Sequence, residues 1–255
     1  MNSLIADCSP LTRPLDLPLY SIDKIVNEID SESILVVAPH PDDETLGCGG
    51  AIALLRSRGC TVKILVVSDG TQSHPNSSKY PAPILRNLRA TETIWAMGLL
   101  GVETNHITFL QLPDGAVPKI REPDFQAAVN QCHAYLELAN PKIVFAPFRS
   151  DPHPDHRATW QILCTAIRQS RLSPRVIEYP IWDWDPKQRK LSNQDVIHPW
   201  RLDIAEVLTL KQQAIAAYRS QTTNLIDDDP NGFRLTAEML ENFAQPWEIY
   251  LEENY

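Results

Sequence analysis

Short apolar runs alternate with helix-patterned segments along most of this chain, and that alternation narrows the fold more than any other feature does. The run ILVVAP at 34–39 is apolar at every position, which is typical of a strand buried on both faces. Strands that alternate with helices predict an α/β fold in which a parallel sheet has helices on both faces. Further strands are expected at 62–68, 106–110, 143–147 and 175–179, and helices at 47–58, 84–100, 124–138 and 157–169.

The same pattern indicates a single domain over residues 1–255, built on a Rossmann-like, mostly parallel sheet. A chain of 255 residues is long enough for one large core and barely long enough for two. Residues 1–20 contain three prolines and are expected to form an extended arm on the surface. Beyond residue 180 the pattern is less regular, with a strand expected at 200–204, helices at 206–219 and 236–243, and a polar loop at 224–232.

Charge and cysteine content argue against several classes of protein. The net charge is −9, whereas a nucleic acid or an anionic membrane needs a positive protein face. The five cysteines are an odd number and include no CxxC, so neither a disulfide framework nor a thiolate zinc site is expected. The first residues lack the features of a signal peptide, and no run of about 18 apolar residues occurs. We therefore expect a cytoplasmic protein without a membrane span and without a nucleic-acid partner.

Acidic residues and histidines follow four of the predicted strands, at the point where each strand ends. The segments are HPDDE at 40–44, SDG at 68–70, LPDG at 112–115 and DPHPDH at 151–156. Ligands of open parallel sheets bind outside the carboxyl ends of the strands. We therefore expect these four segments to meet at one rim of the sheet, together with three of the seven histidines.

Two of these segments carry residues that suit a metal ion. In the first, His40 and Asp43 can bind one ion from a tight turn while Asp42 stays free to act as a base. Alternatively, its acidic residues only cap the start of a helix. In the second, His153 and His156 allow the same two interpretations, but two such segments at neighbouring strand ends favour a metal site. Two histidines and one aspartate leave a fourth position for water, which a nearby carboxylate can deprotonate.

These motifs resemble those of the LmbE/PIG-L family of zinc-dependent N-acetylglucosaminide deacetylases. The family signature is an apolar strand that ends in HPDDE, followed later by HPDH, and this chain has ILVVAPHPDDETLGCGG and APFRSDPHPDHRAT. Weaker features of the same kind are SDG, LPDG, the pair Arg89 and Glu92, and KQQAIAAYRSQ at 211–221. The resemblance covers about residues 33–221, which is the motif-bearing core of the predicted domain.

The resemblance implies a metal centre and a catalytic base. His40, Asp43 and His156 would bind one zinc ion per chain, although iron(II) or cobalt could occupy the same ligands. Asp42 would act first as general base and then as general acid. His153 would stabilise the oxyanion that forms during hydrolysis.

Two further roles follow from the resemblance, and one feature departs from it. Asp155 would lie beyond the metal ligands and orient His153. Arg89 would lie near the polar head of the substrate, with a solvated helix residue as the alternative. Some family members have a tyrosine directly before HPDH that assists the oxyanion, whereas this chain has FRSD at 148–151. Either His153 acts alone or another group contributes.

The expected function is therefore zinc-dependent removal of an N-acyl group, acetyl above all, from a small glucosamine-type sugar conjugate. Two alternatives stay open: an amidase that acts on a thiol-sugar or another acylated amine conjugate, and a non-catalytic carbohydrate-binding protein. Phosphoester hydrolysis is disfavoured because two-metal sites need more carboxylate ligands. Trp182 and Trp184 form either an aromatic platform for the sugar or packing beneath the C-terminal helices. The sequence leaves the aglycone and a homo-oligomer open.

Overall fold

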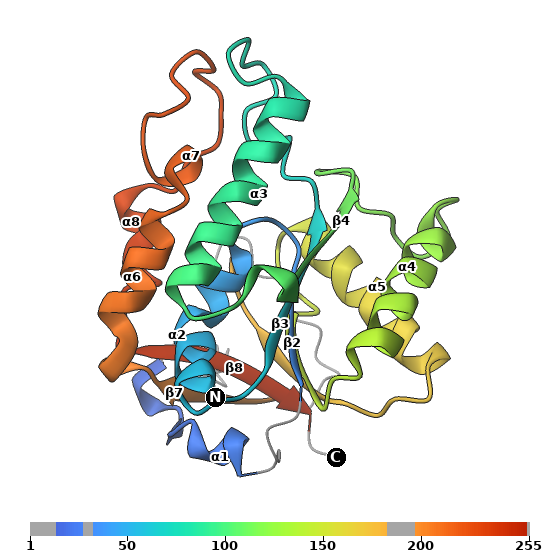
Figure 1. Ribbon diagram of the computed structural model, residues 1–255, viewed down its shortest axis with the longest axis vertical. Helices are drawn as coiled ribbons and strands as arrows, with labels where there is room; N and C mark the ends of the chain where they lie inside the picture. Colours follow the sequence, from blue (N-terminus) through green and yellow to red (C-terminus); the bar gives the residue numbers. More distant parts are fainter. Residues whose placement is uncertain (1–13, 28–32, 183–196, 254–255) are drawn as a thin grey trace, which may run out of the picture.

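The computed structural model describes residues 14–27, 33–182 and 197–253, and in them eight strands form a single sheet (Figure 1). The strand order is β1-β7-β8-β6-β5-β2-β3-β4. The strands are β1 (Leu19–Tyr20), β2 (Ile34–Ala38), β3 (Val62–Ser68), β4 (Ile107–Leu112), β5 (Ile143–Pro147), β6 (Arg175–Tyr179), β7 (Ile197–Asp203) and β8 (Trp247–Glu253). Every described pairing is parallel except the two that involve β8. The predicted mostly parallel α/β sheet is confirmed.

Helices cover both faces of the sheet, which explains why the central strands are apolar throughout. On one face lie α2 (Asp43–Ser57), α3 (Ala82–Leu99) and α6 (Leu208–Ala216), and on the other α4 (Phe125–Ala139) and α5 (Pro154–Gln169) (Figure 1). Successive side chains of a strand point to opposite faces. In β2, Ile34 and Val36 accordingly pack on the first side, and Leu35 and Val37 on the second.

The order of the strands reverses direction at β2, and this reversal places the site. Strand β2 pairs with β3 on one side and with β5 on the other, so the loops after β2 and β5 diverge to opposite faces. Such a switch point leaves a crevice at the carboxyl ends of the two strands. The HPDDE and DPHPDH segments follow these same two strands.

The C-terminal part departs from the sequence-based prediction in two ways. The helix expected at 206–219 is broken into a 3-10 turn, α6 and α7 (Arg219–Thr222), because Tyr218 leaves the helical conformation with ψ 64° and packs inward. Strand β8 was not predicted at all. It contains Glu248, a buried carboxylate that interrupts the apolar pattern and pairs with Lys211. The helix expected at 236–243 is shorter, α8 (Ala237–Glu241), and Thr236 caps its start.

The N-terminal arm was expected to extend over the surface, and its first 13 residues lie outside the described residues. Of the remainder, Pro14–Asp16 form a 3-10 turn, and β1 pairs in parallel with β7 at the edge of the sheet. A short helix, α1 (Asp23–Val26), follows. Among the described helices, none combines the length and the apolar character that crossing a bilayer requires.

Candidate metal and catalytic site

Two neighbouring strand ends deliver most of the predicted site residues to one rim of the sheet. His40 and Asp42 follow β2, and Asp43 begins α2. His153 and His156 follow β5, at the start of α5. The residues come together from positions more than a hundred apart in the sequence because β2 and β5 are neighbours.

Three atoms from these segments form a compact triangle. Asp43 Oδ2 lies 3.0 Å from His40 Nδ1 and 3.2 Å from His156 Nε2, and the two ring nitrogens are 3.3 Å apart. Tetrahedral ligands held about 2.0–2.1 Å from a zinc ion lie about 3.3–3.4 Å from one another. The triangle therefore matches three of the four ligands of such an ion and leaves one position for a small ligand.

The second nitrogen of each histidine in the triangle faces a carboxylate, as it does in many metal sites. His40 Nε2 lies 3.2 Å from Asp114 Oδ1 and 3.3 Å from Asp155 Oδ2. His156 Nδ1 lies 3.3 Å from Asp151 Oδ1, an ion-pair distance without a well-aligned hydrogen bond. These contacts direct His40 Nδ1 and His156 Nε2 toward Asp43. The described residues thus fit a metal ion both in their donor atoms and in the groups behind the donors.

The charges around the triangle also favour a cation. Burial alone would lower the pKa of His40, but its hydrogen bonds to Asp114, Asp155 and Asp43 raise that pKa well above its ordinary value. Burial alone would raise the pKa of Asp43, yet the His156 and His40 rings hold it well below its ordinary value. Two buried rings surrounded by carboxylates create a negative site that a divalent ion can neutralise.

Two other groups of potential ligands overlap with this triangle. His40 gathers with His153 and His156, and also with Asp114 and Asp155. The Asp43 triangle is compact enough to hold one ion, because its three atoms are mutually 3.0–3.3 Å apart. The Asp114 and Asp155 carboxylates serve the opposite nitrogen of the His40 ring.

Asp42, the predicted base, occupies a strained backbone conformation beside the triangle. Its φ of 131° is one that non-glycine residues rarely adopt, and such strain is concentrated at functional sites. Its side chain is 6% exposed and accepts a hydrogen bond from Arg89 Nη2 at 3.0 Å. Burial raises the pKa of Asp42, and the Arg89 charge opposes that shift.

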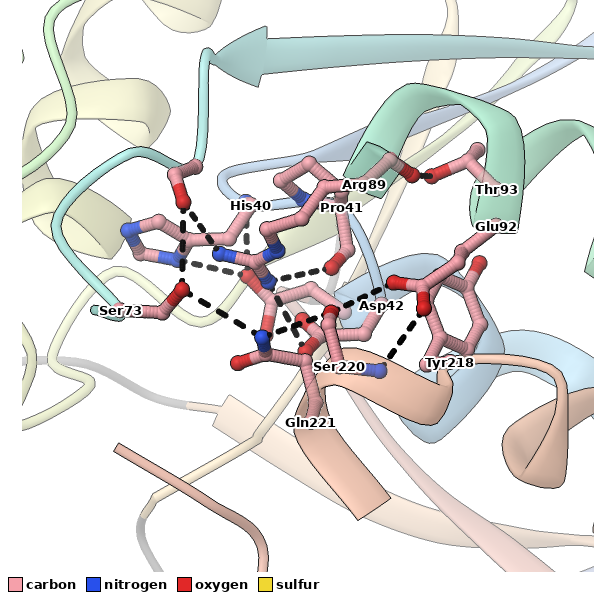
Figure 2. A network of polar contacts seen from close by, with 12 residues as sticks. His40, Pro41, Asp42, Ser73, Arg89, Glu92, Thr93, Tyr218, Ser220 and Gln221 are labelled. Atoms are coloured by element: carbon pink, nitrogen blue, oxygen red, sulfur yellow. Dashed lines mark hydrogen bonds and ion pairs between the residues drawn. The ribbon is translucent and has the colours of Figure 1, made fainter. Parts of the chain in front are cut away.

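Arg89 is buried rather than solvated, which resolves the alternative left open by the sequence. It is 3% exposed and also donates to the Gly70 carbonyl at 3.0 Å and the Pro41 carbonyl at 2.6 Å (Figure 2). Arg89 lines the cleft beside Asp42. Its guanidinium therefore connects the loop after β3 to the HPDDE turn.

His153 presents one ring nitrogen to the cleft. Its Nδ1 accepts the backbone N–H of Asp155 at 3.2 Å, which leaves the proton of a neutral ring on Nε2. Burial lowers the pKa of His153, and the neighbouring His156 and His40 rings lower it further, so the neutral form is favoured. Asp155 was expected to orient His153 with its carboxylate. Instead its backbone does so, while the carboxylate contacts His40 and the Gly115 amide.

Several residues of the site were not assigned from the sequence. Asp114 and Asp151 lie in the loops that follow strands β4 and β5, so their position at the rim was a usable signal. Tyr218 carried no such signal. Its hydroxyl donates to the Glu44 carboxylate, and the other Glu44 oxygen accepts the Asp42 backbone N–H at 3.2 Å.

A cleft of about 530 Å³ opens above these groups. Its polar wall includes Gln72, Ser73 and Gln221 besides the residues above, and the network of Figure 2 links Ser73 to Gln221 through a 3.3 Å hydrogen bond. Its apolar wall consists of Leu46, Trp182, Phe233, Leu235 and Met239. The described residues that line the cleft include no tyrosine, in agreement with the departure seen before HPDH. The rings of Trp182 and Phe233 meet edge-on, with their centroids 5.8 Å apart. Trp184 lies outside the described residues.

Comparison with known proteins gives a consistent result. The family model described as "PIG-L: GlcNAc-PI de-N-acetylase" matches residues 35–167. The chain is 27% identical to a probable N-acetyl-alpha-D-glucosaminyl L-malate deacetylase 2 of Bacillus cereus, over 76% of this chain and 86% of that protein. It is also 27% identical to a diacetylchitobiose deacetylase of Thermococcus kodakarensis, over 80% of this chain and 76% of that one.

Solved structures share the fold at lower sequence identity. An N,N'-diacetylchitobiose deacetylase from Pyrococcus horikoshii aligns over 91% of this chain and 88% of its own with a TM-score of 0.60 and 23% identity. A 4-carboxy-2-hydroxymuconate hydratase from Pseudomonas putida aligns over 88% of this chain and 96% of its own, with a TM-score of 0.57 and 19% identity. Because one fold holds both a deacetylase and a hydratase, the reaction has to be argued from the site.

Proposed function

The chain belongs to the PIG-L family of de-N-acetylases, and from this premise we propose that it hydrolyses the N-acetyl amide of a small glucosamine-containing sugar conjugate. The observation that carries the proposal is the triangle of His40, Asp43 and His156 with the Asp42 carboxylate beside it. Three ligands and a free carboxylate are the minimum that a metal-dependent amide hydrolase needs.

We assign one divalent ion per chain to the triangle, zinc above other metals, because one carboxylate and two imidazoles are ligands that zinc prefers. Bound there, such an ion supplies a Lewis acid that polarises the acyl carbonyl and makes a neighbouring water more acidic. The remaining chemistry belongs to side chains of the chain itself.

Asp42 carries the proton through the reaction. Its carboxylate takes a proton from the attacking water as the oxygen–carbon bond forms. It then gives that proton to the sugar nitrogen as the carbon–nitrogen bond breaks, so the products are acetate and a free amine. The hydrogen bonds from Arg89 and from the Asp42 amide to Glu44 hold the carboxyl in place for both transfers.

His153 stabilises the negative charge that develops on the acyl oxygen. Its Nδ1 is occupied by the Asp155 amide, so the Nε2–H is the ring's donor toward the cleft. In the absence of a tyrosine along the described cleft, His153 supplies this donor without one.

The sugar lies along the polar wall of the cleft in this proposal. Hydroxyl groups need several donors and acceptors at close range, and Gln72, Ser73 and Asp114 offer both. The relatives named above act on N-acetylglucosamine joined to malate and on diacetylchitobiose, which supports a glucosamine conjugate as the substrate class. The described cysteines are unbridged, and a cytoplasmic location stays a prediction.

The test measures metal content and amine release on one preparation, with N-acetylglucosamine and a panel of its conjugates as substrates. We expect about one zinc per chain and chelator-sensitive release of amine. Asp42→Asn should retain the metal and lose about a hundredfold or more in kcat, because the base is removed and the ligands remain.

His156→Ala serves as the complementary variant, since it removes a ligand and leaves Asp42 in place. It should lose metal and turnover together. Near-normal turnover of Asp42→Asn would contradict the role of Asp42, and full zinc retention by His156→Ala would remove His156 from the ligands. A wild-type chain that binds no zinc would contradict the whole proposal.

A further inference from the structure

A second cavity of about 270 Å³ lies beside the cleft. Three parts of the chain contribute to both spaces. The segment after β6 lines the second cavity with Pro180 and the cleft with Trp182. The α8 region lines the second cavity with Phe243 and the cleft with Met239. The third is helix α2, which contributes Leu46 to both. Because the two spaces share Leu46 and draw on the same three parts of the chain, they adjoin at this residue.

Leu46 is the one described residue that lines both the cleft and the second cavity. Its side chain is 2% exposed, so it fills the boundary between the two spaces. It lies three residues after Asp43 on α2, and residues three apart in a helix share a face. The Leu46 side chain therefore forms a partition between the cleft and the second cavity, on the side of the cleft where Asp43 lies.

The second cavity can accept an apolar group. Leu46, Phe243, Trp247 and Ile249 contribute apolar surface to it. Its two charged residues neutralise each other, since Lys211 Nζ lies 2.8 Å from Glu248 Oε1. The Glu248 carboxylate also accepts the backbone N–H groups of Gly50 and Ala51, at 2.7 and 2.9 Å. An apolar chain that enters would thus leave no charge without a partner.

We propose that Leu46 determines the length of the acyl group that the enzyme removes, and that the second cavity is an acyl-chain site closed by this side chain. The inference rests on the proposed amide hydrolysis, because the acyl carbon must then lie at the His40, Asp43 and His156 triangle. From there the sugar occupies the polar wall, and the acyl tail points to Leu46. An acetyl methyl group fits against Leu46, whereas a longer chain meets the partition.

The experiment compares kcat/KM for the N-acetyl, N-butyryl and N-hexanoyl forms of one glucosamine conjugate. Wild type should favour acetyl. Leu46→Ala joins the two spaces and should raise the hexanoyl-to-acetyl ratio by about tenfold or more, the discrimination that one or two methylene groups give in an apolar pocket. Leu54→Ala is the matched control, since Leu54 is a buried leucine of the same helix that lines neither the cleft nor the second cavity. Its ratio should stay at the wild-type value.

A binding measurement makes the result independent of turnover. Hexanoate should bind to zinc-loaded Leu46→Ala at least about tenfold more tightly than to wild type, while acetate binding changes little, as calorimetry can measure. If Leu46→Ala does not fold, Leu46→Val takes its place, because it removes less of the buried side chain. It should shift the hexanoyl-to-acetyl ratio and the hexanoate affinity in the same direction. Thermal unfolding of each variant verifies that the compared proteins are folded.

The outcomes separate this inference from the proposed function. A folded Leu46→Ala with the wild-type chain-length profile and wild-type hexanoate affinity overturns the inference. A wild-type enzyme that cleaves hexanoyl as well as acetyl overturns it too. If no acylated glucosamine reacts but hexanoate binding still rises in Leu46→Ala, the proposed substrate is wrong and the second cavity remains an apolar chain site.

Discussion

Asp42 shows how much of this site depends on residues that never touch the metal. A non-glycine residue at φ 131° costs free energy, so contacts from elsewhere have to hold it. Arg89 holds its carboxylate, and Glu44 holds its backbone N–H. Tyr218 in turn donates its hydroxyl to Glu44, and both side chains are buried. The position of the proposed base is thus set by a chain of contacts that reaches to the end of α6.

Tyr218→Phe tests that chain. The variant should lower kcat by about tenfold with KM and zinc content unchanged, because a loosened Glu44 no longer holds the Asp42 turn. The loss of a buried hydrogen bond to a carboxylate should also lower the free energy of unfolding by about 1.5–3 kcal/mol. Steady-state kinetics and urea unfolding measure the two effects.

Tyr250→Phe provides the matched control. Tyr250 is equally buried, and its hydroxyl donates to another buried carboxylate, Glu248, at 2.8 Å. This variant should lose a similar amount of stability and keep its kcat. An equal fall in kcat for both variants would mean that Tyr218 acts only through stability.

At the scale of elements, helix α2 is the part that positions the metal ligands. Its first residue is Asp43, and it packs on the sheet through glycines that allow a close approach. A Cβ at Gly50 would lie 2.5 Å from Ile204 Cγ2 and 2.7 Å from its Cβ, which is too close for the branched side chain to adjust. The Gly50 amide also donates to Glu248 of β8, so the strand absent from the prediction anchors the helix.

Gly50→Ala should therefore destabilise the protein by about 1–3 kcal/mol, the usual cost of overpacking a close-packed interior. Urea unfolding measures the change. Gly98→Ala is the control, because Gly98 lies in helix α3 with no atom within 4 Å of an added Cβ. That substitution should stabilise by about 0.5–1 kcal/mol. If Gly50→Ala were as stable as wild type, the close approach of α2 to Ile204 would not constrain the helix.

At the scale of the whole molecule, a metal ion would join two halves of the sheet. His40 and Asp43 come from the β2 side and His156 from the β5 side, so an ion bound to all three crosslinks the two sides of the switch point. An ion that binds only the folded state stabilises that state by mass action. The overall fold alone does not decide the reaction, since the hydratase named above shares it.

Removal of the ion should lower the melting temperature. With zinc at about a hundred times its dissociation constant, the stabilisation is about 2.7 kcal/mol, which corresponds to about 5–10 °C for a chain of this size. Differential scanning calorimetry before and after dialysis against a chelator measures the shift, and added zinc should restore the original value. In His156→Ala the chelator should have little effect. A wild-type melting temperature that does not change when zinc is removed would contradict a crosslinking ion.

The sequence by itself determined the class of fold and the location of the site. Fully apolar runs between amphipathic helices are compatible with few architectures other than a covered parallel sheet, and His or Asp residues that follow such strands must meet at its carboxyl edge. The choice of His40, Asp43 and His156 as the ligand set came from the resemblance to the PIG-L family, whose two motifs are specific. Both kinds of information are local in the chain.

Only the tertiary structure decided which groups support the reactive ones. Tyr218 reaches Glu44 through tertiary packing that no local pattern encodes. Asp114 and Asp151 had a signal for their place at the rim, but only the structure shows that they face His40 and His156. The structure also showed that Arg89 is buried against Asp42 and that Asp155 orients His153 through its backbone N–H. The partition formed by Leu46 belongs to the same class, because a cavity exists only where separate elements pack imperfectly against one another.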